Sequence, residues 1–243
     1  MISRVIDANA FFGTYPKRKV DGSPKSLVTL LKKNGVDLAL AVSMKGVFYD
    51  YREGNDETLR ICSEEHMLLP VGTIDPRRYY GDKGEIERFS QTGFKLVRLF
   101  PEYQGWPIDY APLKMLMREI DDMGMPLMIT ANAYGMSTAI AELHSSFSFP
   151  IILASIGYWT MSEAIAIMKH SEKIYVETHL VDSPDGIKIL CEEAGAERLV
   201  FGSNLPLTYF LGPFLAVRNS DITESDKRLI LGGNIERLVA EKE

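Results

Sequence analysis

The chain has 243 residues, with 27 Lys and Arg against 33 Asp and Glu, so its formal charge is −6 at neutral pH. No basic run offsets this acidic balance, which argues against nucleic acid as a partner. No apolar run approaches the ~18–20 residues that a membrane span needs. The N-terminal segment also lacks the apolar core of a signal peptide. We therefore expect a cytoplasmic protein with one domain over residues 1–243.

Eight short, nearly continuous hydrophobic runs follow one another along the chain. Such runs are typical of strands in a parallel sheet whose two faces are both covered. The predicted strands are residues 5–11, 36–43, 68–75, 94–100, 126–131, 150–157, 173–179 and 198–204.

Amphipathic segments separate these runs, and several have recognisable ends. Pro24 follows Ser23 at a helix start, and Gly35, Gly93, Gly124 and Gly195 stand where left-handed C-terminal caps are expected. Alternating strands and helices predict a parallel α/β fold. A count of eight favours a closed (β/α)₈ TIM barrel over an open doubly wound sheet. In a barrel the irregular stretches 12–22 and 45–55 would surround the mouth where active sites lie.

The segments that end these strands resemble the amidohydrolase superfamily, in its amidohydrolase-related branch of metal-dependent hydrolase-like barrels. The resemblance runs from the first strand to the last helix. It is carried by Val-Ile-Asp-Ala-Asn9-Ala-Phe11-Phe-Gly, Gly-Phe-Lys-Leu-Val-Arg98-Leu-Phe100-Pro, Tyr103-Gln-Gly-Trp106-Pro-Ile-Asp109, Pro-Leu-Met-Ile-Thr130, Ile-Leu-Ala-Ser155-Ile-Gly, Gly-Ala-Glu-Arg-Leu-Val-Phe-Gly-Ser-Asn204-Leu-Pro and Ile-Leu-Gly-Gly-Asn234-Ile-Glu-Arg-Leu.

The resemblance implies a barrel whose metal ligands are histidines and an aspartate at the strand ends. The corresponding positions here are Asn9, Phe11, Phe100, Thr130, Ser155 and Asn204. None of these is an imidazole, thiolate or carboxylate, which are the ligands that zinc and similar ions need. The substitutions also suit one another, because neutral groups leave no unpaired buried charge. The prediction is therefore a rebuilt site with no metal and no other cofactor.

Two residues are candidates for proton transfer. Glu177 and His179 stand two apart on the seventh predicted strand, so they share a face and could act as acid and base. The structural alternative places His179 on the loop beyond the strand.

Arg98 is the one well-placed basic residue. Asp7 shares strand parity with Asn9 and Phe11, and Arg98 shares parity with Phe100. The structural interpretation is a buried Asp7–Arg98 ion pair. The functional interpretation is that Arg98 binds a ligand carboxylate or phosphate with its planar fork.

Asn9, Phe11, Arg98, Phe100, Thr130, Ser155 and Asn204 are thus predicted to form a site for a small molecule, with a carboxylate as the favoured ligand. A serine nucleophile is disfavoured because no adjacent base is evident. Three functions stay open. The first is a metal-independent lactonase, hydrolase or decarboxylase that acts on a small carboxylate. The second is an inactive barrel that binds a ligand or pairs with an active relative, and the third is an enzyme with metal held by Asp7, Asp75 and Glu177. A homodimer is possible if an apolar helix face is exposed.

Overall fold

The computed structural model describes residues 4–81 and 84–240. Eight parallel strands pair in chain order from β1 to β8. Every strand overlaps its predicted range. The strands are β1 Ile6–Phe12, β2 Leu38–Ser43, β3 Leu68–Thr73, β4 Leu96–Leu99, β5 Leu127–Thr130, β6 Ile151–Ala154, β7 Ile174–Glu177 and β8 Leu199–Val200.

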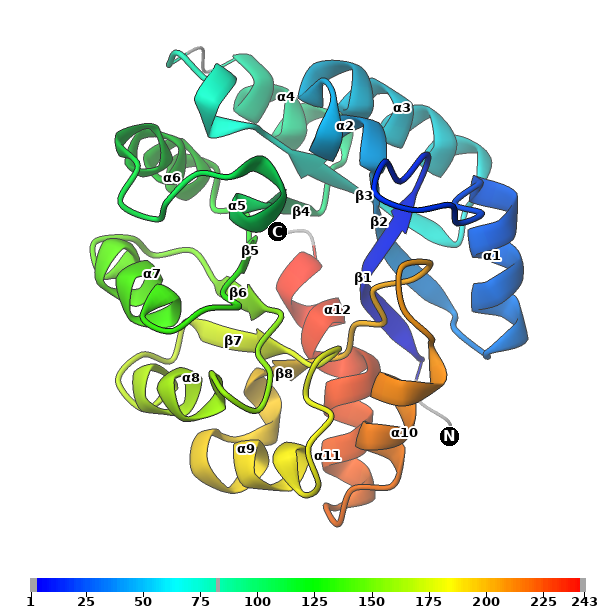
Figure 1. The fold of residues 1–243 in the computed structure, drawn as a ribbon, viewed down its shortest axis with the longest axis vertical. Helices are drawn as coiled ribbons and strands as arrows, with labels where there is room; N and C mark the ends of the chain where they lie inside the picture. Colours follow the sequence, from blue (N-terminus) through cyan, green and yellow to red (C-terminus); the bar gives the residue numbers. More distant parts are fainter. Residues whose placement is uncertain (1–3, 82–83, 241–243) are drawn as a thin grey trace.

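Hydrogen bonds between the segment after β8 and strand β1 close the sheet. Ala8 N donates to Phe201 O at 2.8 Å, Asn204 N donates to Asn9 O at 2.8 Å, and Phe11 N donates to Leu205 O at 2.8 Å. The fold is therefore the predicted (β/α)₈ barrel, and Figure 1 shows its helices arranged around the strands.

The outer layer consists of helices that follow the strands in order. They are α1 Pro24–Lys33, α3 Tyr51–Glu64, α4 Gly84–Thr92, α6 Ala111–Met123, α7 Met136–His144, α8 Met161–Met168, α9 Gly186–Ala194, α10 Leu211–Arg218 and α11 Glu224–Arg228. Ser23 caps α1 by accepting from Ser26 N at 3.2 Å, next to Pro24 as predicted. The four glycines predicted at helix ends all have positive φ, between 61° and 94°.

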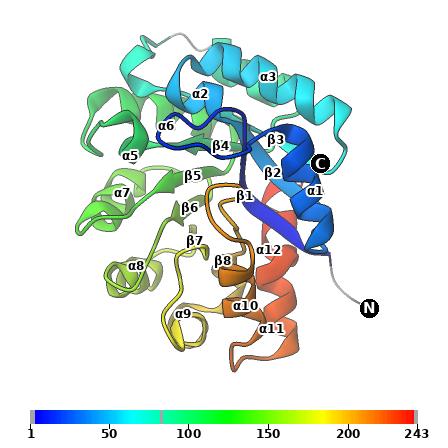
Figure 2. The same ribbon diagram turned by 45° about the vertical axis from the view of Figure 1, so that its right-hand side comes forward.

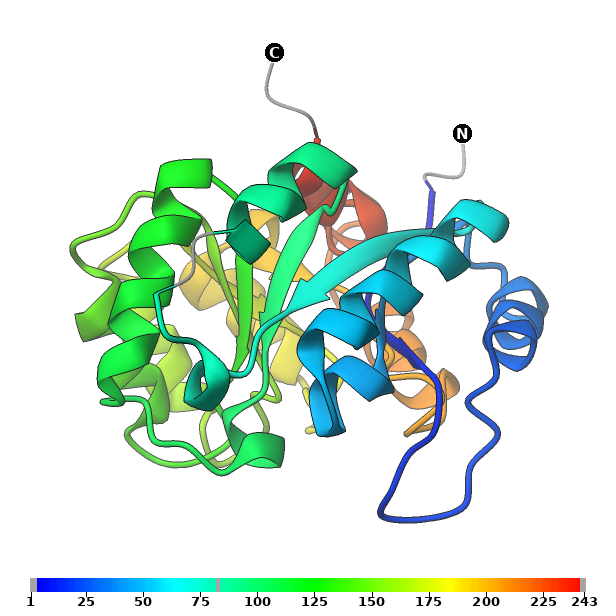
Figure 3. The ribbon, with the colours of Figure 1, turned by 90° about the horizontal axis from the view of Figure 1, so that it is seen from above.

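Short elements fill the connections. α2 Met44–Phe48 and α5 Pro101–Gln104 follow β2 and β4, and η1 Pro76–Arg78 follows β3. The prediction of an irregular stretch at 45–55 is thus wrong, because Ser43 and Asp50 cap two helices there. Residues 13–22 are irregular as expected. This dark blue loop extends from the end of the barrel opposite α12 (Figure 3).

The apolar core has two layers. One lies between strands and helices, and the other fills the barrel interior with alternate strand residues such as Ile6, Leu40, Leu96 and Met128. Two short helical segments, η2 Ala196–Arg198 and η3 Leu229–Gly233, precede the last described helix, α12 Asn234–Val239. Ile235 of α12 is fully buried in the interior cluster. This helix closes the barrel at the end where the strands begin (Figures 1 and 2).

A β-bulge in β1 changes the expected direction of one side chain. The pairing of β1 with β2 runs Asp7↔Ala39 and then Ala10↔Ala41, so β1 carries one extra residue. Such a bulge interrupts the alternation of faces. Ala8 therefore packs in the interior cluster, and Asp7 bonds to the segment after β8 instead. The Asp7 carboxylate accepts from Ser203 N at 2.9 Å and from Ser203 Oγ.

Candidate functional site

A cavity of about 230 Å³ lies at the carboxyl ends of the strands. Five predicted site residues line it, namely Phe11, Arg98, Ser155, His179 and Asn204. The other four, Asn9, Phe100, Thr130 and Glu177, are buried and support those that reach the cavity. Sequence reasoning did not place Glu102, Leu180 or Thr208 in the site, although they also line the cavity together with Tyr103 and Asn132.

Glu177 and His179 form a bonded pair. Oε2 of Glu177 lies 2.6 Å from Nδ1 of His179, and Oε1 accepts from the backbone N–H of His179 at 2.7 Å. Burial alone would raise the pKa of Glu177, but His179, its two hydrogen bonds and Arg98 together lower that pKa. An ionised carboxylate only accepts, so Nδ1 carries a proton, and in the neutral ring Nε2 is the nitrogen left as the acceptor. This arrangement suits a general base. The strand ends at Glu177, so His179 does lie beyond it.

The position of Glu177 depends on two neighbours. Asn9 Nδ2 donates to Glu177 Oε2 at 3.1 Å across the barrel. Gly202 faces the carboxylate so closely that a Cβ at this residue would lie 2.2 Å from Glu177 Oε1. Only glycine leaves room there. The glycine of the Phe-Gly-Ser-Asn204 segment is therefore a contact surface for the carboxylate.

Arg98 brings a buried positive charge to the cavity. Its NH2 donates to Thr130 Oγ1 at 3.0 Å, and its guanidinium lies 4.7 Å from the centroid of the Phe100 ring. The predicted ion pair with Asp7 is wrong because the bulge turns Asp7 toward Ser203. Arg98 Nε is buried and makes no hydrogen bond within residues 4–81 and 84–240. Burial lowers the pKa of Arg98, against the opposing effect of Glu102 and Glu177.

Glu102, the first of the residues that sequence reasoning missed, is the acidic neighbour of this guanidinium. Burial raises the pKa of Glu102, and Arg98 opposes that effect. Its Oε2 atom is buried and has no hydrogen-bond partner in the described part of the chain. The available signal was its place in Phe100-Pro-Glu102, directly after β4. Arg98 and Glu102 thus each have one buried polar atom without a partner among the described residues. Such atoms are uncommon in folded proteins.

Ser155 and Asn204 reach the cavity through an uncommon backbone conformation. Their φ angles are 65° and 56°, in the left-handed region that disfavours residues other than glycine. Ser155 directly follows β6, where Ile152 and Ala154 face the interior. Simple alternation would send Ser155 outward, and the left-handed turn brings it to the cavity. Strained residues of this kind gather at functional sites.

Aromatic rings form one wall and the floor. The Phe11 and Phe100 ring centroids are 5.7 Å apart, and Phe100 stacks on Tyr103 at 6.0 Å. Lys17 from the loop after β1 lies over the outer face of this group, 4.9 Å from the Tyr103 centroid. Phe100 is fully buried, so Phe11 and Tyr103 are the two rings of this group that line the cavity.

Other acidic and polar groups do not converge in the same way. Asp75 bonds to Arg77 NH2 at 2.8 Å. Asp7 and Glu177 are linked through Asn9, whose backbone N–H donates to Asp7 Oδ1 at 3.0 Å and whose Nδ2 donates to Glu177 Oε2 at 3.1 Å. No group of three His, Cys, Asp or Glu side chains that could hold a metal is found in the described ranges. The described helices also include none long and apolar enough to cross a bilayer.

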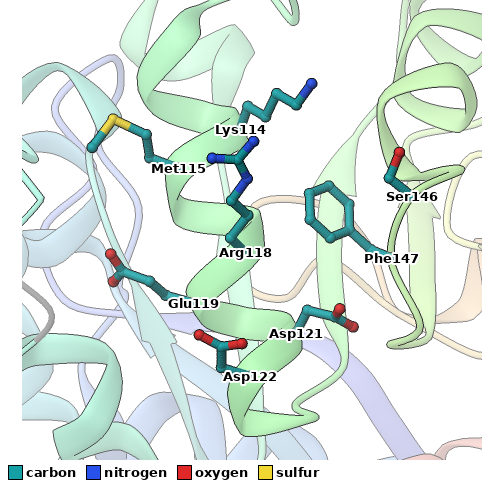
Figure 4. Close-up of a pocket in the computed structure, with 8 residues that line it drawn as sticks. All are labelled: Lys114, Met115, Arg118, Glu119, Asp121, Asp122, Ser146 and Phe147. Carbon is teal, nitrogen blue, oxygen red and sulfur yellow. The ribbon is translucent and has the colours of Figure 1, made fainter.

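A second hollow, of about 550 Å³, lies on the outside of the barrel at α6 (Figure 4). Its acidic and basic side chains come from one helix face, with Phe147 opposite. Asp121 there accepts from Ser148 N at 2.7 Å, and Glu119 bonds to Tyr79 on its other side. Asp121 and Glu119 therefore already have partners. The hollow is also remote from the mouth, where barrel enzymes act.

Comparison with known proteins agrees with the fold and supplies the family. The family model described as Amidohydrolase matches residues 70–240. The chain belongs to the amidohydrolase family. No curated protein matches the chain.

The similar solved structures cover nearly the whole chain at low sequence identity. 5-Carboxyvanillate decarboxylase from Sphingomonas paucimobilis is 16% identical, with a TM-score of 0.75 over 97% of this chain and 98% of that one. A putative amidohydrolase from Staphylococcus aureus is 9% identical, with a TM-score of 0.79 over 97% and 99%. The 5-carboxyvanillate decarboxylase from Novosphingobium aromaticivorans, complexed with manganese and 4-hydroxy-3-methoxy-5-nitrobenzoic acid, is 14% identical, with a TM-score of 0.74 over 98% of this chain and 96% of that one.

Proposed function

We propose that this protein binds a small molecule that bears a carboxylate at the barrel mouth and hydrolyses an ester bond in it, as a lactonase-type enzyme, without a catalytic metal. The observation that carries the proposal is that Arg98 and the Glu177–His179 pair meet at one cavity. At about 230 Å³ this cavity is smaller than the ~300–1,000 Å³ of common ligand pockets, which favours a small ligand. A solved relative holds a benzoic acid, so a carboxylate ligand has a precedent in this fold.

The metal-independent part of the proposal depends on the chemistry of the donors. Of the six positions that the family resemblance marks as metal ligands, Phe11 and Phe100 have no donor atom, and Thr130 accepts from Arg98. Asn9 is bonded to Glu177, and Ser155 and Asn204 offer neutral oxygens. A fixed guanidinium in the same cavity would also repel a divalent cation. These residues do not fit a divalent metal, so we derive no step through one.

The proposed reaction uses five residues. Arg98 holds the substrate carboxylate through the Nε–H that has no partner in the described structure, with Ser155 and Asn204 as further hydrogen-bonding groups. His179 Nε2 takes a proton from water, whose oxygen forms a bond to the ester carbonyl carbon. The carbon–oxygen bond of the ester then breaks, and His179 returns the proton to the leaving alkoxide. Glu177 stabilises the imidazolium that forms between these steps, as carboxylates do in serine hydrolases.

The second candidate is an inactive barrel that binds the same ligand or partners an active relative. The contact between Phe11 and Phe100 favours this candidate, because two apolar rings stand at positions where the family resemblance implies metal-ligating side chains. Both candidates predict carboxylate binding, and only the first predicts turnover. A homodimer and a cytoplasmic location belong to the proposal in either case.

The test has two stages. The first measures metal content by mass spectrometry on untagged protein purified without chelator. We expect less than about a tenth of an equivalent, because real zinc sites fill nearly stoichiometrically, and one equivalent or more would overturn the metal-free proposal. The second stage screens lactones and aryl esters that bear a carboxylate, with wild type and His179→Gln. Turnover lost in His179→Gln supports the hydrolase, whereas carboxylate binding without any turnover supports the inactive barrel.

A further inference from the structure

Three large aromatic side chains are exposed together beside the mouth. Tyr134 from the loop after β5 is 75% exposed, and Trp159 from the loop after β6 is 72% exposed. Tyr158 lies edge-on to Trp159, with ring centroids 5.1 Å apart. Most single exposed aromatic residues need no explanation, but a contiguous exposed apolar patch marks a place where something binds.

These residues border a hollow that adjoins the carboxylate site. The hollow is about 490 Å³ and is lined by Asn132, Ala133, Tyr134, Trp159 and Thr160. Asn132 also lines the smaller cavity that holds Arg98 and His179. The two cavities therefore adjoin at Asn132.

The two loops are tied to each other, so the hollow is formed before any ligand arrives. Glu163 of α8 accepts from Gly135 N at 3.0 Å and from Thr138 N at 2.7 Å. These bonds hold the loop with Tyr134 against the helix that follows Trp159. A site fixed in advance loses less free energy on binding than one that must be ordered.

We propose that this hollow, defined by Asn132, Ala133, Tyr134, Trp159 and Thr160, is a subsite for a flat aromatic tail on the same ligand. The smaller cavity has the charged groups Arg98, Glu102 and His179, whereas the lining of the hollow has no charged side chain. The ligand class is thus an arylalkyl carboxylate, with its acid head at Arg98 and its ring stacked on Trp159. The inference rests on the proposed function for the head group.

Tryptophan fluorescence gives a direct readout, because the chain has two tryptophans in different surroundings. Trp106 is 5% exposed and donates to Gln104 Oε1 at 2.8 Å, so acrylamide quenches mainly Trp159. The probes are acetate, which has only the head group, and 4-phenylbutyrate, which adds the ring. We expect 4-phenylbutyrate to bind at least tenfold more tightly than acetate and to protect Trp159 from acrylamide.

Three variants make the test specific, with affinities measured by calorimetry. Trp159→Ala should lose the tenfold advantage while acetate affinity stays unchanged, and Trp159→Phe should keep most of it because a flat ring remains. Tyr80→Ala removes a still more exposed ring that lines neither cavity and should behave as wild type.

Equal affinity of wild type for both probes would overturn the subsite, and so would an advantage that survives in Trp159→Ala. If Trp159→Ala instead converts a dimer to a monomer with ligand affinity unchanged, the patch is a contact between copies and the subsite is again wrong. Failure of both probes to bind wild type would overturn the proposed carboxylate function itself.

Discussion

Nδ1 of His179 lies 2.6 Å from Oε2 of Glu177, and the backbone N–H of the same histidine donates to the other carboxylate oxygen. Two bonds from one residue to both oxygens fix the carboxylate and the ring together. Nε2 is then the ring nitrogen that makes no bond to Glu177. This geometry makes the protonation state of His179 a measurable structural property, independent of any substrate.

The first prediction concerns that tautomer. ¹⁵N NMR of histidine-labelled protein should show His179 with its proton on Nδ1, and the signal is assigned by its loss in His179→Gln. Glu177→Gln should abolish this fixed tautomer and reduce hydrolysis by a factor of about 10²–10⁴, the range expected when general base catalysis is lost. An unchanged tautomer in Glu177→Gln would show that the carboxylate does not control the ring.

The second prediction concerns Arg98. Arg98→Ala should weaken binding of a small carboxylate by a factor of about 10–100, in line with ~1.5–3 kcal/mol for hydrogen bonds to charged groups. Arg98→Lys retains the charge but loses the planar fork, so its affinity should be intermediate. Thermal shift and calorimetry with acetate measure both. Full affinity in Arg98→Ala would place the carboxylate elsewhere.

The third prediction tests the contact between Gly202 and Glu177. Gly202→Ala puts a Cβ within 2.2 Å of Glu177 Oε1, so the carboxylate must move. We expect a loss of ~1–3 kcal/mol in the free energy of unfolding, as for other overpacked sites, and loss of the His179 tautomer. Chemical denaturation measures the first effect and NMR the second.

Gly212→Ala is the matched control for this variant. A Cβ at Gly212 meets no atom within 4 Å, and the residue lies inside α10. Alanine there should be neutral or stabilising by up to ~1 kcal/mol, because it is the better helix former. Equal effects at both glycines would contradict the close contact with Glu177.

The fourth prediction follows from Asp7. Burial raises its pKa to about 7, against the hydrogen bonds from Ser203 and Asn9. The folded protein therefore keeps this proton up to about pH 7, while the unfolded chain releases it near pH 3.8. Between these values the unfolded state binds fewer protons, so rising pH favours unfolding. The stabilisation is fully present below pH 3.8 and is lost as pH rises through 7.

Asp7→Asn should remove this dependence. The amide preserves the acceptor for the Ser203 and Asn9 N–H groups and cannot ionise. The difference in stability between variant and wild type should change by up to ~4 kcal/mol between pH 3.8 and 7, since each pKa unit corresponds to ~1.36 kcal/mol. Parallel pH profiles of Tm for the two proteins would show that Asp7 is not the responsible group.

The sequence was sufficient for the fold because each strand is a short apolar run with a helix start or glycine cap beside it. It was also sufficient to predict which face of β4 carries Arg98. The strand alternates regularly, so Arg98 lies on the same face as Leu96 and Phe100, which pack in the interior. It failed for Asp7 because a single bulge residue shifts the parity of β1, and no local pattern reveals a bulge. Glu102 was missed because its place in the cavity depends on the short helix α5. A helix of four residues is too short to give a recognisable sequence pattern.

The site residues divide in the same way. Strand alternation leads to Glu177, whereas Ser155 reaches the cavity through a left-handed backbone turn that alternation does not predict. The positions of Ser155 and Asn204 at the ends of predicted strands, together with the family resemblance, mark them as site residues.

Helix α12 fills the barrel at the end opposite the mouth, with Ile235 packed among strand residues of the interior. The barrel therefore has one entrance. A ligand that reaches Arg98 must leave through the mouth by which it entered. Any product that keeps the carboxylate and the ring would compete with the next substrate for that passage, so release of product, rather than access, would limit how fast such a site could be reused.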